Sequence, residues 1–122
     1  MTAQELTRIA AKLARVRPLP GGSCATVAAA LHTQAGNVFT GICVDLRCSL
    51  GFCAERAAAA EMLKGGETQV TMMVAVDSQG DVVPPCGACR EFLAQLDAGN
   101  CEAQVVMGAG TLAALGTLLP HR

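Results

Sequence analysis

The sequence predicts an α/β fold in which a mixed β-sheet carries helices on both of its faces. Three observations support this prediction. The first segment has apolar residues at helical spacing, two later runs are apolar without interruption, and helix-like and strand-like segments alternate along the chain. With 122 residues and a mass of 12.4 kDa, residues 1–122 are expected to form a single domain with its own hydrophobic core.

The first half of the chain is predicted to form a helix followed by a β-hairpin. Residues 2–16 have helical periodicity and begin with a Thr-x-x-Glu capping box. The Pro-Leu-Pro-Gly-Gly sequence at 18–22 ends this helix in a loop. The short apolar runs at 25–32 and 37–44, joined by a glycine-containing turn, are typical of two paired strands.

The second half is predicted to alternate helices and strands. An alanine-rich helix is expected over residues 53–64, and another helix follows a Pro-Pro pair over residues 87–96. The uninterrupted apolar runs at 70–76 and 103–107 are typical of strands buried on both faces. Residues 111–119 are ambiguous and fit a strand followed by a helical turn.

The composition excludes several classes of function. Hydrophobic residues make up 52% of the chain and charged residues 16%, which excludes a disordered chain. The net charge of −1 provides no basic surface for a nucleic-acid backbone. The chain has three Phe, no Tyr and no Trp, so it also lacks aromatic platforms for stacking bases. We therefore expect no nucleic-acid partner.

The distribution of charge also bears on location. Charged residues interrupt the first 17 positions, where a signal peptide would need an apolar run. Glycine, proline and amide side chains interrupt the two long uncharged segments, 18–44 and 103–121, so neither is expected to span a membrane. We expect a soluble, cytoplasmic protein. A mean hydropathy of +0.40 is high for such a chain and favours a subunit interface, although a dense core is the alternative.

Seven cysteines are many for a chain of this length. Their odd number and the lack of an expected secretory signal argue against a closed disulfide framework and favour metal binding or catalysis. Three of them fall in two motifs, Cys-Ala-Glu-Arg at 53–56 and Pro-Pro-Cys-Gly-Ala-Cys-Arg at 84–90. Alone, the Cys-x-x-Cys pair fits half a zinc site, a redox pair or a chance spacing.

Together, the two motifs predict a metal site with three thiolate ligands. Cys53 opens one predicted helix, and Cys86 and Cys89 lie at the start of another. The free N–H groups and partial positive charge of helix N-termini lower thiol pKa values and favour thiolates. Three protein ligands leave the fourth position of a zinc ion for water, as in catalytic zinc sites. Zinc makes such a water acidic.

Two residues beside the first cysteine complete this hypothesis. Glu55 is close enough to the open position to take a proton from the water and pass it to a substrate without binding the metal. Three thiolates leave zinc with a net charge of about −1, which the guanidinium of Arg56 and the two helix dipoles would offset. An exposed helix charge is the alternative interpretation of Arg56.

The paired motif resembles that of the zinc-dependent cytidine deaminase family, which includes small homotetrameric cytidine deaminases and blasticidin S deaminase. The resemblance extends from about residue 20 to the Leu-Leu-Pro near the C-terminus. It implies a three-layer α/β/α sandwich around a five-stranded mixed sheet, and assembly into a homotetramer. It also implies hydrolytic removal of an exocyclic amino group, as ammonia, from a small-molecule amine.

The resemblance assigns a role to each motif residue by its position. The three motif cysteines would hold Zn²⁺, and Glu55 would transfer the protons. The backbone N–H of Ala54 would bind the ring carbonyl of the substrate, and the backbone carbonyl of Pro84 would receive the departing amine. Arg56 would hydrogen-bond a ligand thiolate.

The substrate-binding half departs from the family pattern. Where cytidine deaminases carry Asn-x-Glu to hold the ribose, this chain has Cys43 and Asp45. The aromatic residues that pack on the base are missing from their usual positions; Phe52, beside the zinc motif, is either a substitute or an ordinary core residue. Because a thiol is a weak hydrogen-bonding group, we expect poor activity on cytidine itself.

Three alternatives to a cytidine deaminase stay open. The first is a deaminase of another ring, such as a blasticidin-like antibiotic or a modified nucleoside or base, which Cys43 favours. The second is a non-catalytic zinc-binding module, against which Glu55 argues because a structural site has no use for an unligated carboxylate. The third is a metal-free thiol–disulfide protein, which would depend on Cys89 and not on Glu55.

Overall fold

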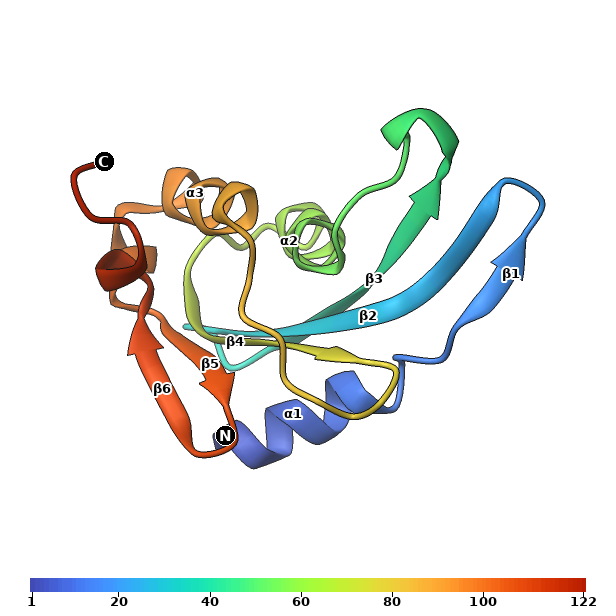
Figure 1. The fold of residues 1–122 in the computed structure, drawn as a ribbon. Helices are drawn as coiled ribbons and strands as arrows, with labels where there is room; N and C mark the ends of the chain where they lie inside the picture. Colours follow the sequence, from blue (N-terminus) through green and yellow to red (C-terminus); the bar gives the residue numbers. More distant parts are fainter.

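The computed structural model describes all 122 residues and confirms the α/β fold, with a mixed sheet between helices (Figure 1). None of the helices combines the length and the apolar character needed to cross a lipid bilayer. The helices are α1 (Ala3–Ala11), α2 (Ala54–Lys64) and α3 (Gly87–Leu96), with short 3-10 turns η1 (Arg47–Ser49), η2 (Ala98–Glu102) and η3 (Leu115–Leu118). The strands are β1 (Arg17–Leu19), β2 (Gly22–Thr33), β3 (Val38–Leu46), β4 (Val70–Asp77), β5 (Gln104–Gly108) and β6 (Thr111–Ala114).

Strand β2 organises the sheet. It pairs antiparallel with β3 along one edge and with β1 and then β4 along the other. Strand β4 pairs parallel with β5, and β5 pairs antiparallel with β6. The predicted hairpin is therefore β2 and β3, and the ambiguous segment near the C-terminus is β6 followed by η3. As Figure 1 shows, the β1–β2 turn and the end of β3 extend beyond the helices.

Strand β1 makes six strands where about five were predicted. It occupies part of the segment 18–22, which its proline and glycine content indicated as a loop. Pro18 is compatible with a strand here because β1 lies at a sheet edge and pairs only with the first residues of β2.

Helix α1 also differs from the prediction, since it ends at Ala11 and not at residue 16. Its start is as predicted: the Thr2 side chain accepts a hydrogen bond from the Glu5 N–H at 3.1 Å. Beyond the helix, the Leu13 N–H donates to the Ala10 carbonyl in a tighter 3-10 turn. The apolar spacing thus persists where the α-helical hydrogen bonds do not.

The helices cover opposite faces of the sheet, α2 and α3 on one and α1 on the other (Figure 1). Alternate residues of the central strands fill the two cores. In β4, Met73 and Ala75 belong to the core under α2 and α3, whereas Val74 and Val76 belong to the core under α1. This confirms the prediction from the uninterrupted apolar run that β4 is buried on both faces.

Gly41 of β3 allows helix α2 to pack close against the sheet. A Cβ atom at Gly41 of β3 would collide with backbone atoms of Ala54 and Ala58, both in α2. The helix therefore lies directly against the sheet, and its first turn is held at a fixed height above β3. That first turn carries the first of the two motifs.

Candidate active site

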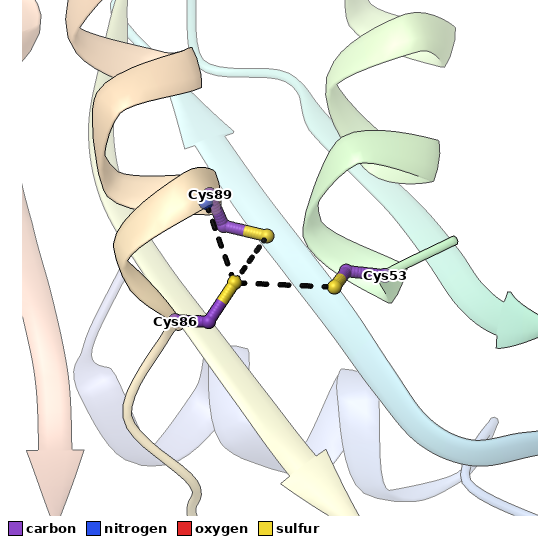
Figure 2. A group of neighbouring side chains, drawn as sticks. All are labelled: Cys53, Cys86 and Cys89. Atoms are coloured by element: carbon purple, nitrogen blue, oxygen red, sulfur yellow. Dashed lines mark hydrogen bonds between the residues drawn. The ribbon is translucent and has the colours of Figure 1, made fainter. Parts of the chain in front are cut away.

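Three cysteine side chains converge from two helix N-termini, as Figure 2 shows. Cys53 is the N-cap of α2, Cys86 is the N-cap of α3, and Cys89 lies in the first turn of α3. The Sγ atom of Cys86 is 4.0 Å from that of Cys53 and 3.4 Å from that of Cys89. All three sulfur atoms lie within 4.8 Å of one another. The two motifs, 33 residues apart in the chain, thus form one cluster.

This cluster fits a tetrahedral metal ion. A Zn–S distance of about 2.3 Å places tetrahedral thiolate ligands about 3.8 Å apart, close to the separations observed here. The Nε atom of Arg56 is buried beside the cluster and has no hydrogen-bond partner within the chain, as expected where an additional negative charge has to be neutralised. The three thiols could therefore hold a metal ion.

The surroundings of the thiols affect their protonation in different ways. Burial acts to raise the pKa of Cys86, but hydrogen bonds from the N-terminus of α3 and from the neighbouring thiols outweigh it, so the pKa is lowered. The Cys89 N–H contributes by donating to Cys86 Sγ at 3.5 Å. Cys89 itself is fully buried, and its pKa is raised by this burial and by the nearby charge of Glu55.

Arg56 lies beside Cys53 with its Nη2 atom 3.7 Å from Cys53 Sγ. This hydrogen bond is the main reason why the pKa of the guanidinium is raised further above its ordinary value. The arginine is therefore a fixed positive charge at the cluster, and the structure does not place it on an exposed helix face.

Glu55 occupies the first turn of α2 and is only 6% exposed. Burial raises the pKa of its carboxyl group, opposed by a backbone hydrogen bond and by the charge of Arg56. A carboxyl group whose pKa moves toward neutrality is suited to accept and return a proton.

A cavity of about 580 Å³ adjoins the cluster. The structure brings to its wall every residue that the sequence marked as a candidate for substrate or metal contact except Cys89, which lies behind in the core. Phe52 is 48% exposed and stands at the cavity, so it is not a core residue. The predicted residues in the wall are Cys43, Asp45, Phe52, Cys53, Ala54, Glu55, Arg56, Pro84 and Cys86.

Thr26 was not among the predicted site residues, but it connects two of them in this wall. Its Oγ1 donates to Asp45 Oδ2 at 2.9 Å and also lies 2.9 Å from Cys43 Sγ. Thr26 reaches them because β2 bulges between Cys24 and Ala28, with Ala25 at a φ of 62°. A polar residue within an apolar run was the only sign of this in the sequence.

Arg90 ends the second motif, and no role was predicted for it. Its Nε donates to the Pro85 carbonyl at 2.8 Å and its Nη1 to the Leu118 carbonyl at 3.4 Å. These contacts fix the backbone immediately before Cys86 against the C-terminal segment. Arg90 thus supports the cluster from behind without lining the cavity.

Curated cytidine deaminases match this chain in sequence, and each match covers only part of the chain. No protein-family model matches the chain. A probable cytidine deaminase from Dictyostelium discoideum is 38% identical over 68 residues, which are 54% of this chain and 46% of that protein. The cytidine deaminase from Halalkalibacterium halodurans is 35% identical over 88 residues, which are 70% of this chain and 63% of that protein. The matched region spans less than two thirds of the length of either relative.

Solved structures match almost the whole chain. Cytidine deaminase from Mycobacterium tuberculosis has a TM-score of 0.85 at 29% identity, covering 99% of this chain and 96% of that chain. Cytidine deaminase from Burkholderia pseudomallei has a TM-score of 0.79 at 29% identity, covering 99% and 98%. Sequence and structure therefore lead to the same conclusion. The chain belongs to the cytidine deaminase family.

Proposed function

We propose that this protein is a zinc-dependent hydrolytic deaminase. Its substrate would be a cytidine-like nucleoside or a related aminated heterocycle, from which it removes an exocyclic amino group as ammonia. The observation that carries this proposal is the convergence of three cysteine thiols and a buried carboxyl group, Glu55, on one cavity. The relatives, all named cytidine deaminases, support the same activity.

The metal would be Zn²⁺, held by Cys53, Cys86 and Cys89. When bound with one open position, zinc acidifies a water molecule and so supplies a nucleophile near neutral pH. Arg56 and the N-termini of α2 and α3 would offset the charge of the three thiolates.

The remaining steps belong to groups of the chain itself. Glu55 would accept one proton from the attacking water and deliver it to the ring nitrogen, and would then transfer the second proton, from the hydroxyl now attached to the ring, to the leaving amine. The Ala54 N–H, one of the unpaired donors at the start of α2, would hold the ring carbonyl. The Pro84 carbonyl, which lines the cavity, would accept a hydrogen bond from the departing amine.

The proposal is tested by measuring ammonia release from a panel of aminated pyrimidines, purines and pteridines, with the zinc-loaded protein. Release from at least one ring is expected. A non-catalytic zinc module would release none, and a thiol–disulfide protein would instead oxidise and reduce the Cys86–Cys89 pair, whose sulfur atoms are 3.4 Å apart.

Cytidine is expected to be a poor substrate. Cys43 and Asp45 would replace the amide and the longer carboxylate that the family uses for ribose, and each hydrogen bond lost to a desolvated partner costs about 1–3 kcal/mol. Two such losses lower kcat/KM by about two orders of magnitude or more. A steady-state assay giving a kcat/KM near ~10⁶ M⁻¹s⁻¹ for cytidine would show that these residues bind ribose well.

We further propose that the protein is a homotetramer. Three large apolar side chains are exposed on or beside the cavity wall: Leu46 at 36%, Leu50 at 74% and Phe52 at 48%. Such a cluster is unusual on a monomer and fits a surface that another subunit covers. Light scattering is expected to give a particle about four times the chain mass. A 12.4 kDa particle at micromolar concentration would contradict this prediction.

The proposed location is the cytoplasm. The seven cysteines are free in the structure, and free thiols are typical of compartments in which disulfides are rare. Apart from the other subunits, the partner in this setting would be the small-molecule substrate, with no nucleic acid or membrane.

A further inference from the structure

Part of the cavity wall, outside the thiol cluster, is a small hydrogen-bonded group formed by Thr26, Cys43 and Asp45. Thr26 Oγ1 lies 2.9 Å from Asp45 Oδ2 and 2.9 Å from Cys43 Sγ, and Cys43 Sγ lies 3.6 Å from Asp45 Oδ2. The Val27 N–H donates to Cys43 Sγ at 3.3 Å. All four residues line the cavity.

The hydrogen-bond donors of this wall are all used within the wall itself. The single hydroxyl hydrogen of Thr26 is donated to the Asp45 carboxylate. The single thiol hydrogen of Cys43 can point to Thr26 Oγ1 or to Asp45 Oδ2, both inside the group. The Val27 N–H is also engaged. No donor is left for a ligand, whereas the second carboxylate oxygen, Asp45 Oδ1, accepts no hydrogen bond from the chain.

The charge of the wall is not balanced from within the molecule. The ion pairs of the chain join Lys64 to Glu61 and Arg122 to Glu91, and neither involves Asp45. The only basic side chain lining the cavity is Arg56, which donates to Cys53 Sγ. A carboxylate in such a position attracts a cation or a hydrogen-bond donor and repels an anion.

We propose that Thr26 is a positioning residue that fixes Asp45, and that the wall is an acceptor-only subsite. It selects an aminated heterocycle whose appendage presents a hydrogen-bond donor, with an ammonium group preferred over a hydroxyl. This inference rests on the proposed deaminase function for the ring and concerns only the recognition of the appendage. It also assigns to Thr26 an effect on substrate binding and not on the chemical step.

The test uses a series of ligands that differ only in the appendage. The zinc-loaded protein is assayed with 2′,3′-dideoxycytidine, 2′-deoxycytidine and cytidine analogues with an amine at the 3′ or the 5′ carbon. An amine at one of these carbons is expected to raise kcat/KM at least about tenfold over the hydroxyl, through KM, which is the size expected for a charge-assisted hydrogen bond. Equal values across the series would overturn the inference.

Three variants separate positioning from general structural damage. Thr26→Val keeps the shape but removes the hydroxyl and is expected to reduce the amine preference about tenfold, with kcat little changed. Thr26→Ser keeps the hydroxyl and should retain the preference. Asp45→Asn introduces a donor and should abolish the preference for ammonium. An unchanged amine preference in Thr26→Val would refute the role of Thr26.

Calorimetric binding of the same ligands to Glu55→Gln distinguishes this inference from the proposed function. If no ligand is deaminated but the amine still binds more tightly than the hydroxyl, and Thr26→Val removes the difference, the deaminase proposal fails and the subsite stands. If the ligands are deaminated with no preference for the appendage, the subsite fails and the deaminase proposal stands.

Discussion

Glu55→Gln is expected to lower ammonia release by at least about 10²-fold while leaving zinc content and fold unchanged. The amide has nearly the shape of the carboxyl group and still forms hydrogen bonds, so it fills the same 6%-exposed position in α2. It cannot accept a proton from water, however, and the proposed reaction needs one proton to be carried to the ring and a second to the amine. The measurement is steady-state ammonia release with whichever ring proves active.

The matched control for this variant is Glu61→Gln in the same helix. Glu61 is exposed and pairs only with Lys64, at 3.0 Å on the helix surface, so its loss should leave turnover unchanged. Zinc analysis and circular dichroism of both variants show whether the site and the fold are intact. Ammonia release close to that of the wild type in Glu55→Gln would remove Glu55 from the mechanism.

The thiol cluster could be predicted from sequence because local rules decide it. Cys53 and Cys86 are the N-caps of α2 and α3, and helix starts can be recognised from the residues around them. Because both helices pack on the same face of the sheet, their first turns meet and the cysteines converge. The same applies to the two-faced burial of β4, which follows from its uninterrupted apolar run.

The substrate wall could not be predicted in the same way because it depends on long-range pairing. Thr26 meets Asp45, 19 residues away, only through the register of β2 with β3 and the bulge that interrupts it. Nothing in a stretch such as Ala-Thr-Val-Ala requires a bulge, and Ala25 adopts a positive φ that its residue type disfavours. The pairing of β1 with the start of β2 was hidden for a related reason, since Pro18 locally indicates a loop.

Cys89→Ala is expected to reduce zinc from about one ion per chain to a small fraction and to abolish turnover. Cys89 is the fully buried member of the cluster, and without it only two protein ligands remain, too few for a tight site. Elemental analysis of the purified variant measures the loss directly. Cys101→Ala, which alters a half-buried cysteine outside the cluster, is the matched control and should keep its zinc.

Stability gives an independent measure of the same site. An ion that binds only the folded chain, at a free concentration about a thousandfold above Kd, adds about 4 kcal/mol to the free energy of unfolding. For a domain of this size, that corresponds to about 10–20 °C in Tm. Chelation should therefore lower the Tm of the wild type by this amount but leave Cys89→Ala almost unchanged, because that variant has no ion to lose. This difference separates loss of zinc from the small cavity that the substitution leaves, since the cavity is present with and without chelator. Full zinc in Cys89→Ala, or an equal response of both proteins to the chelator, would exclude Cys89 as a ligand.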